Sequence, residues 1–163
     1  MCIRDSGIAV YGMDPFGDDP RPHGLEPALE LHARVAEIKA AAPGESAGYG
    51  RRFVADRATE IATVPVGYGD GVRRGLSGAC DVLVGGRRRP LVGTVSMDNV
   101  TLDLGPVHEV SRDDDAVLIG AQGDERILAE ELARRLDTIN YEITCGISAR
   151  VPRVYHRDGE RVA

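Results

Sequence analysis

The 163-residue chain contains no tryptophan, and aromatic residues make up only 4% of it. A core with so few large aromatic side chains has to be built from aliphatic ones, so we expect Val, Leu, Ile and Ala to fill it. Lysine is almost missing as well: of the 20 basic residues only Lys39 is a lysine, and the others are arginines. The chain therefore has almost no side chain that could act as an amine nucleophile.

Three further absences narrow the class of protein. No apolar run approaches the ~18 residues of a membrane-spanning helix, and no signal peptide is visible. The net charge is −6, so the basic surface that binds nucleic-acid phosphates is missing. The three cysteines, Cys2, Cys80 and Cys145, are odd in number and scattered, which fits a reducing cytoplasm better than a disulfide framework.

The residues that are present have globular proportions, with 42% hydrophobic and 28% charged. Gly7–Gly12 (GIAVYG) predicts a short buried strand. Apolar residues three and four positions apart predict a helix over Leu25–Ala42. Beyond Gly44 the pattern changes to short, β-branched, alternating segments, which predicts a mainly β domain.

In that second part we expect a hairpin around Gly85-Gly86 and a helix over Ile127–Leu136. The expected strands are Thr59–Val66, Cys80–Val84, Pro90–Ser96, Val100–Leu104, Ala116–Ile119 and Val151–Tyr155.

Four polar and aromatic clusters are candidates for chemistry, centred on Tyr49, Tyr68, Met97 and Tyr141. Each one alone is also compatible with a turn or a packing residue. A phenol between two glycines, such as Tyr49, can act as a general acid or base when nearby cations favour its ionised form. The glycines around Tyr68 permit close backbone approach to a ligand, but the Lys-Ser/Thr of a phosphate loop does not follow them. The histidines lack metal-ligand spacing, so we expect no metal.

Taken in chain order, these clusters carry a resemblance to a known family. The segments GIAVYG, GYG, VPVGYGDG, GTVSMDN, LIGAQGDE and TINYEITCGISARVPRVY resemble the C-terminal part of alanine racemase, the pyridoxal-phosphate enzyme of fold type III. The resemblance covers about residues 7–155 and only the second half of a family member. It implies a mainly β fold, with residues 44–163 as the C-terminal β domain. Residues 7–43 would then be the last strand and helix of an N-terminal α/β TIM barrel, and residues 1–6 (MCIRDS) a non-family junction.

The resemblance also implies roles at the substrate. Tyr49 matches the catalytic tyrosine, which exchanges the Cα proton on the L-alanine face. In the family it acts on the cofactor of the partner subunit in a homodimer. Met97 matches the residue whose backbone binds the substrate carboxylate, and Tyr68 matches a tyrosine near the site entrance.

The cofactor implied is pyridoxal 5'-phosphate. Tyr141 matches the tyrosine that hydrogen-bonds its phosphate, and Gly7 and Ile8 match the positions whose backbone N–H groups receive the same phosphate. The Schiff-base lysine of the family is expected upstream and absent from this chain, because Lys39 is not at a matching position. An arginine at the pyridine nitrogen is expected two residues before Gly7, where this chain has Asp5.

These implications lead to one expected function and two alternatives. We expect the C-terminal part of an alanine racemase, which interconverts L- and D-alanine for peptidoglycan synthesis in a bacterial cytoplasm, and we expect this piece to be inactive alone. A serine or broad-specificity amino-acid racemase remains open, because residues upstream would line that pocket. A non-catalytic β domain that binds a partner is the alternative of a different class.

Overall fold

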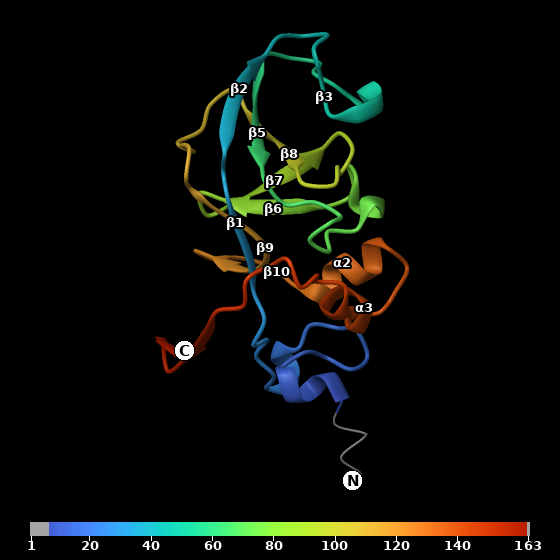
Figure 1. Cartoon of the computed structure of the whole chain (residues 1–163), viewed down its shortest axis with the longest axis vertical. Helices are drawn as coiled ribbons and strands as arrows, with labels where there is room; N and C mark the ends of the chain where they lie inside the picture. Colours follow the sequence, from blue (N-terminus) through green and yellow to red (C-terminus); the bar gives the residue numbers. More distant parts are fainter. Residues whose placement is uncertain (1–6, 163) are drawn as a thin grey trace.

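The computed structural model describes residues 7–162, and its main feature is an eight-stranded antiparallel sheet (Figure 1). The strands of this sheet are β1 (Leu31–Arg34), β2 (Glu37–Ala41), β5 (Thr59–Val64), β6 (Asp81–Val84), β7 (Arg87–Val92), β8 (Val100–Gly105), β9 (Asp115–Gln122) and β10 (Glu125–Ile127). Their order is β1-β9-β6-β7-β8-β5-β2, with β10 added to β9. The mainly β fold class is therefore confirmed.

The two edges of this sheet are formed by neighbouring stretches of one segment, since β1 pairs with β9 and β2 pairs with β5. At the bend between them, Val35 donates its N–H to the carbonyl of Asp114 at 2.9 Å, and Ala36 donates to Thr63 at 2.9 Å. The segment from β1 to β2 thus joins both edges, which leaves few unpaired backbone groups along them.

The predicted helix over Leu25–Ala42 is wrong, because β1 and β2 occupy that stretch. Leu31 and Val35 are buried while His32 and Arg34 point to solvent, which is the alternation of a strand. The spacing of the apolar residues is compatible with a helix or with strands, and the backbone hydrogen bonds to β9 and β5 favour the strands. The expected division at residues 43 and 44 falls inside the sheet, because β2 before it pairs with β5 after it. What was expected about residues 1–6 lies outside the described residues.

The elements expected after residue 44 are largely confirmed. The strands β5, β8 and β9 lie where the sequence predicted strands. β6 and β7 form the predicted hairpin, and both residues of its turn, Gly85 and Gly86, have positive φ values of 63° and 70°. The predicted second helix is α2 (Ala129–Arg135). The strand expected over Val151–Tyr155 is wrong, since strand structure begins only at Tyr155.

Several short elements surround the sheet. They are the 3-10 helices η1 (Gly7–Tyr11), η2 (Arg21–His23), η3 (Tyr49–Arg51) and η4 (Arg74–Leu76), the helix α3 (Asn140–Cys145), and the strand pairs β3 (Ser46–Ala47) with β4 (Phe53–Val54) and β11 (Tyr155–Arg157) with β12 (Glu160–Val162). The strand expected over Gly7–Gly12 is wrong, because this segment is the helical turn η1. Gly7 and Gly12 have φ values of 41° and 75°, which an extended strand does not use.

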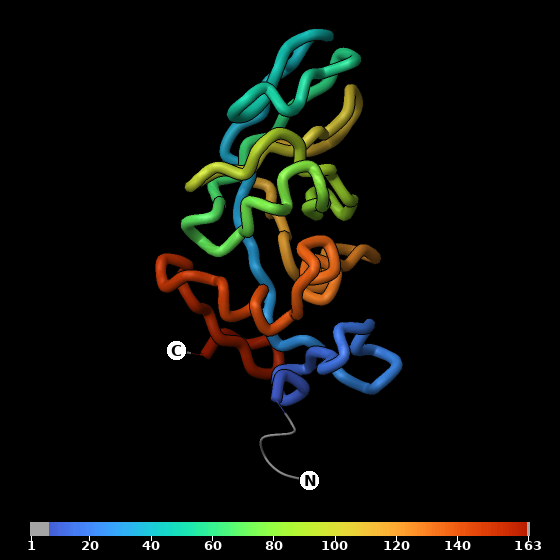
Figure 2. Tube along the Cα trace, turned by 90° about the vertical axis from the view of Figure 1, so that its right-hand side faces the viewer, coloured from blue at the N-terminus to red at the C-terminus, as the bar shows by residue number. Residues whose placement is uncertain are grey.

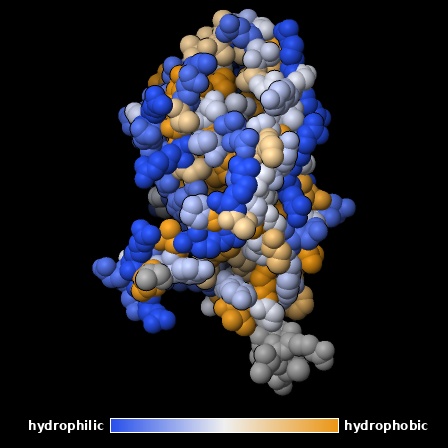
Figure 3. Space-filling view, in the orientation of Figure 1, coloured by the Kyte–Doolittle hydropathy of each residue, from blue (hydrophilic) through white to orange (hydrophobic). Residues whose placement is uncertain are grey.

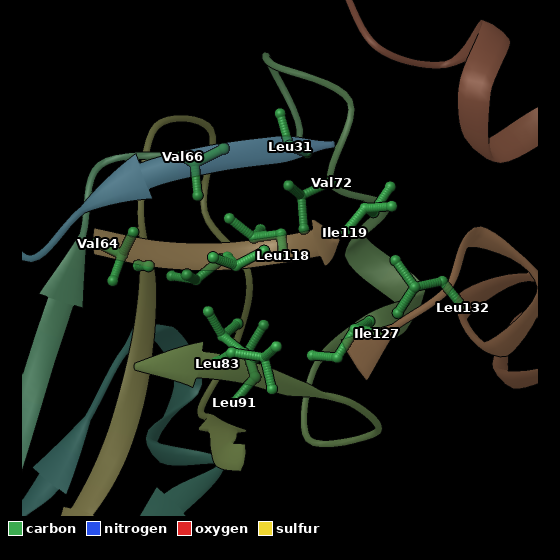
Figure 4. Packing of buried hydrophobic residues seen from close by; sticks show 14 of the residues in the cluster. Leu31, Val64, Val66, Val72, Leu83, Leu91, Leu118, Ile119, Ile127 and Leu132 are labelled. Carbon is green, nitrogen blue, oxygen red and sulfur yellow. The ribbon is translucent and has the colours of Figure 1, made fainter. Parts of the chain in front are cut away.

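The core is aliphatic, as the composition predicted. Figure 4 shows Leu83, Leu91 and Ile127 among the packed hydrophobic side chains of the core, and all three are buried. Hydrophilic side chains cover much of the face in Figure 3, with hydrophobic ones exposed toward the end that carries η1, where Val10 and Tyr11 are exposed. Among residues 7–162 no helix is long and apolar enough to cross a bilayer.

Candidate functional site

Tyr49 lies at the tip of the β3–β4 hairpin, between two glycines with positive φ, Gly48 at 76° and Gly50 at 71°. Its backbone is anchored, because the Thr94 hydroxyl donates a hydrogen bond to the Tyr49 carbonyl at 3.0 Å. The hairpin also lies against Gly93, where an added Cβ would come within 2.7 Å of the Ala47 carbonyl oxygen. The Tyr49 side chain is nevertheless 74% exposed. A fixed backbone therefore presents a free phenol to whatever lies next to this surface.

Tyr68 and Met97 are brought together by two backbone hydrogen bonds between their turns. The Tyr68 N–H donates to the Ser96 carbonyl at 3.0 Å, and the Gly69 N–H donates to the Met97 carbonyl at 2.9 Å. Gly67 is required at this contact, since a Cβ there would lie 2.3 Å from the Ser96 carbonyl oxygen. Both side chains are about half exposed, Tyr68 at 49% and Met97 at 52%. Met97 comes three residues after Thr94, whose hydroxyl holds the Tyr49 backbone, so its turn is also close in the chain to that contact.

An ion-pair bridge that the sequence did not predict lies beside these turns. The Arg150 guanidinium lies 3.1 Å from an Asp70 carboxylate oxygen through Nε and 2.6 Å from an Asp98 oxygen through Nη2. Asp70 belongs to the turn of Tyr68, and Asp98 follows Met97 directly. No local signal in the sequence pairs these residues, because Arg150 is 80 and 52 positions away from them.

Gly7 and Tyr141 also meet. A Cβ built on Gly7 would lie 2.9 Å from the Tyr141 hydroxyl oxygen, and Gly7 has a positive φ of 41°. Ile8 follows Gly7 in η1 and is buried, whereas Tyr141 in α3 is 36% exposed. The first turn of η1 and the Tyr141 hydroxyl therefore face one small space, which a larger residue at position 7 would fill.

A buried polar network holds the segment after η1 against α3. The Asn140 amide donates to the Asp14 carbonyl at 2.8 Å and to the Glu130 carboxylate at 2.9 Å. The Asp14 N–H donates to the same Glu130 oxygen at 3.1 Å. Burial acts to raise the pKa of the Asp14 carboxyl, but hydrogen bonds from His23 and from backbone N–H groups outweigh it and hold the pKa below its usual value. The network ties the residue before Tyr141 to the segment that follows η1.

Tyr49 and the Gly7–Tyr141 pair do not come together in one molecule. β3 and η3 lie at one end of its long axis, and η1 and α3 lie toward the other (Figures 1 and 2). Two shallow hollows lie elsewhere, and neither is lined by Tyr49, Tyr68, Met97 or Tyr141. These side chains therefore lie on open surface, where a reaction that excludes water needs another surface to cover them.

Other nucleophile and metal chemistry finds little support in the described part of the chain. Burial raises the pKa of the Cys80 thiol to about 12, which keeps it protonated and unreactive. Residues 7–162 contain no group of three or more His, Cys, Asp or Glu side chains that could hold a metal ion. Lys39 lies in β2, exposed and 3.5 Å from Glu37, rather than on the helix that the sequence predicted.

Known proteins match the chain in sequence and in structure. Residues 28–155 match the family model for the alanine racemase C-terminal domain. The alanine racemase of Cutibacterium acnes is 47% identical over 157 residues, which are 94% of this chain and 42% of that protein. Alanine racemase 1 of Bacillus subtilis is 44% identical over 155 residues, which are 94% of this chain and 39% of that protein. The chain thus spans about 40% of the length of the relatives it matches.

Solved structures give the same result. The alanine racemase from Bacillus anthracis with bound L-Ala-P superimposes with a TM-score of 0.87 at 44% identity, over 96% of this chain and 40% of that one. The alanine racemase from Bartonella henselae with covalently bound pyridoxal phosphate superimposes with a TM-score of 0.82 at 32% identity, over 92% of this chain and 40% of that one.

Proposed function

Because the chain belongs to the alanine racemase family, whose C-terminal domain it matches, we propose that it is the C-terminal part of an enzyme that interconverts L- and D-alanine. The D-alanine would supply peptidoglycan synthesis in the cytoplasm of a bacterium. The observation that carries the proposal is the family match over residues 28–155, which includes a tyrosine with a fixed backbone and an exposed phenol, Tyr49.

The residues around Gly7 fit the phosphate of pyridoxal 5'-phosphate. A Cβ at Gly7 would contact the Tyr141 hydroxyl at 2.9 Å, so glycine keeps open the space between that hydroxyl and the start of η1. In the proposed site the N–H groups of Gly7 and Ile8 and the Tyr141 hydroxyl hold the phosphate. When bound, the cofactor supplies an electron sink for the charge that develops at Cα of the amino acid.

Tyr49 is proposed to move the Cα proton on the L-alanine face. Its phenol oxygen can take this proton and return it, while the Thr94 hydrogen bond keeps the hairpin backbone in place. Met97 is proposed to bind the substrate carboxylate through its backbone N–H. Its carbonyl already accepts the Gly69 N–H, which fixes the orientation of the peptide groups in this turn, and Tyr68 beside it would line the entrance.

Two copies of the protein are proposed to build each active site. Tyr49 and the Gly7–Tyr141 pair lie toward opposite ends of the long axis, so a site that needs both draws them from different subunits (Figure 1). The exposed phenol of Tyr49 supports this arrangement, since a partner barrel would cover it. The 163-residue chain alone is expected to be inactive, because its single lysine, Lys39, lies on an exposed strand.

The test uses a full-length chimaera in which residues 7–163 replace the matching part of the Cutibacterium acnes enzyme. Tyr49→Phe should lower racemisation roughly 100- to 10,000-fold in both directions, because racemisation needs a proton carrier on each face of Cα. In deuterated water, exchange at Cα should fall far more from L-alanine than from D-alanine. The rates are measured by chiral chromatography and by NMR of the Cα proton.

Tyr155→Phe is the matched control, because Tyr155 is similarly exposed but lies in β11. It should racemise at the parental rate. The 163-residue chain with added pyridoxal phosphate should show no racemisation. Parental activity in Tyr49→Phe, or equal loss of exchange from both enantiomers, would rule out the role given to Tyr49, and an inactive parental chimaera would count against the proposed function.

A further inference from the structure

Three segments far apart in the sequence meet at the turn of Tyr68. Besides its hydrogen bonds to Ser96 and Met97, this turn accepts a hydrogen bond at the Asp70 carbonyl from the Ser148 N–H, at 2.9 Å. The contact with the third segment is close, since a Cβ at Gly71 would lie 2.5 Å from the Gly146 carbonyl oxygen. The turns of Tyr68 and Met97 and the segment after α3 therefore form one unit.

Arg150 is the side chain that connects all three segments of this unit. Its guanidinium bonds Asp70 in one turn and Asp98 in the other, and it lies so close to Gly69 that a Cβ there would be 2.6 Å from Nη1. Asp70 uses its second carboxylate oxygen to accept the Gly67 N–H at 2.9 Å, which closes its own turn. Arg150 thus acts on the backbone that carries Tyr68 and on the backbone that carries Met97.

The charges explain why arginine suits this position. The hydrogen bond to Asp98, together with the attraction of Asp70, raises the pKa of Arg150 above its ordinary value. A guanidinium can bond two carboxylates in different directions through different nitrogens, which a lysine ammonium does with less directional control. Without this cation, the largely buried Asp70 and the exposed Asp98 would remain close to each other with like charge, and their turns would separate.

We propose that Arg150 is a positioning residue that holds Tyr68 and the Met97 backbone in register through Asp70 and Asp98, and thereby sets the affinity of the active site for the substrate carboxylate. This inference rests on the proposed function of the Met97 turn. It separates substrate binding from proton transfer. Arg150 supports binding of the substrate carboxylate, while Tyr49, on the hairpin anchored by Thr94, transfers the proton. Loss of Arg150 should therefore weaken binding more than it slows the chemical step.

The first experiment measures the turn itself in the 163-residue chain and does not depend on activity. Hydrogen exchange of the Tyr68 and Gly69 amides, which donate to Ser96 and Met97, should become about tenfold faster in Arg150→Gln. Amides in the centre of β5 should keep their parental rates. Arg157→Gln, with the same change of charge on the exposed strand β11, is the control and should leave both sets unchanged. Unchanged exchange at Tyr68 and Gly69 would overturn the inference.

The second experiment uses the full-length chimaera. Arg150→Gln should raise KM for L-alanine about tenfold and leave kcat within about threefold of the parental value. Arg150→Lys keeps the charge and should recover part of the loss. Asp98→Asn changes an exposed side chain, so it covers the case in which Arg150→Gln fails to fold, and it should raise KM in the same direction.

The outcomes separate this inference from the proposed function. A fall in kcat with unchanged KM, or no rescue by lysine, contradicts the positioning role even if the enzyme is a racemase. If the parental chimaera is inactive, the proposed function fails, and the hydrogen-exchange result still decides whether Arg150 holds the two turns together.

Discussion

Replacing Asn140 with alanine should destabilise the protein far more than a typical surface change. Asn140 is 1% exposed, and its amide donates to the Asp14 carbonyl and to the fully buried Glu130 carboxylate. A hydrogen bond to a charged group contributes about 1.5–3 kcal/mol and one between neutral groups about 1 kcal/mol. The Asn140→Ala variant loses one of each, so we expect a loss of about 3 kcal/mol in the free energy of unfolding.

The Glu130 carboxylate explains why this loss is not easily relieved. Its Oε2 atom is buried without a hydrogen-bond partner among the described residues, and Oε1 depends on Asn140 and the Asp14 N–H. Removing the amide leaves a buried carboxylate with a single donor. Asn140→Asp keeps the size of the side chain but removes both donors and adds a second carboxylate, so it should be at least as destabilising.

The assay is urea unfolding of the 163-residue chain, followed by far-UV circular dichroism. With a slope of about 2 kcal/mol/M, a loss of about 3 kcal/mol moves the midpoint by roughly 1.5 M. Asn99→Ala is the matched control, because Asn99 is exposed in a turn and should stay within about 0.5 kcal/mol of the parent. A loss below about 1 kcal/mol in Asn140→Ala, or a more stable Asn140→Asp, would refute this account of the network.

Two further predictions concern the edges of the sheet. Burial acts to lower the pKa of His32, but hydrogen bonds with Glu30 and Asp115 outweigh it and raise the pKa above 6.5. The stability that the protonated His32 contributes is therefore fully present below pH 6.5 and is lost as the pH rises through the pKa of the folded state. The urea midpoint should fall modestly between pH 6 and 8 in the parent and less in His32→Gln, and equal slopes would contradict the assignment. A chain that begins at Gly44 lacks β1 and β2 and leaves β9 and β5 with unpaired edges, so it should not unfold cooperatively. A sharp, reversible urea transition in that truncated chain would show that β1 and β2 are dispensable.

The features that could be predicted from the sequence are those that depend on residues close together in the chain. Gly85-Gly86 specified its hairpin because two adjacent glycines supply the positive φ values of the turn. Alternating, β-branched residues indicated β5 and β8, because neighbouring side chains of a strand point to opposite faces, and a short apolar run indicated β9. The motifs around Tyr49, Tyr68, Met97 and Tyr141 indicated the family, and the match to its C-terminal domain confirmed it.

The features that depend on residues distant in the chain could not be predicted and became visible only in the folded structure. The apolar spacing between Leu31 and Ala41 suits a helix or a strand, and it became β1 and β2 because β9 and β5 offered backbone partners. No local pattern in the sequence indicates the contact of Gly7 with Tyr141. The same holds for the ion pairs of Arg150 with Asp70 and Asp98. The cause is the same in each case: turns and alternation follow from the backbone angles of adjacent residues, whereas contacts between segments that are separated in the chain exist only after the whole sheet has assembled.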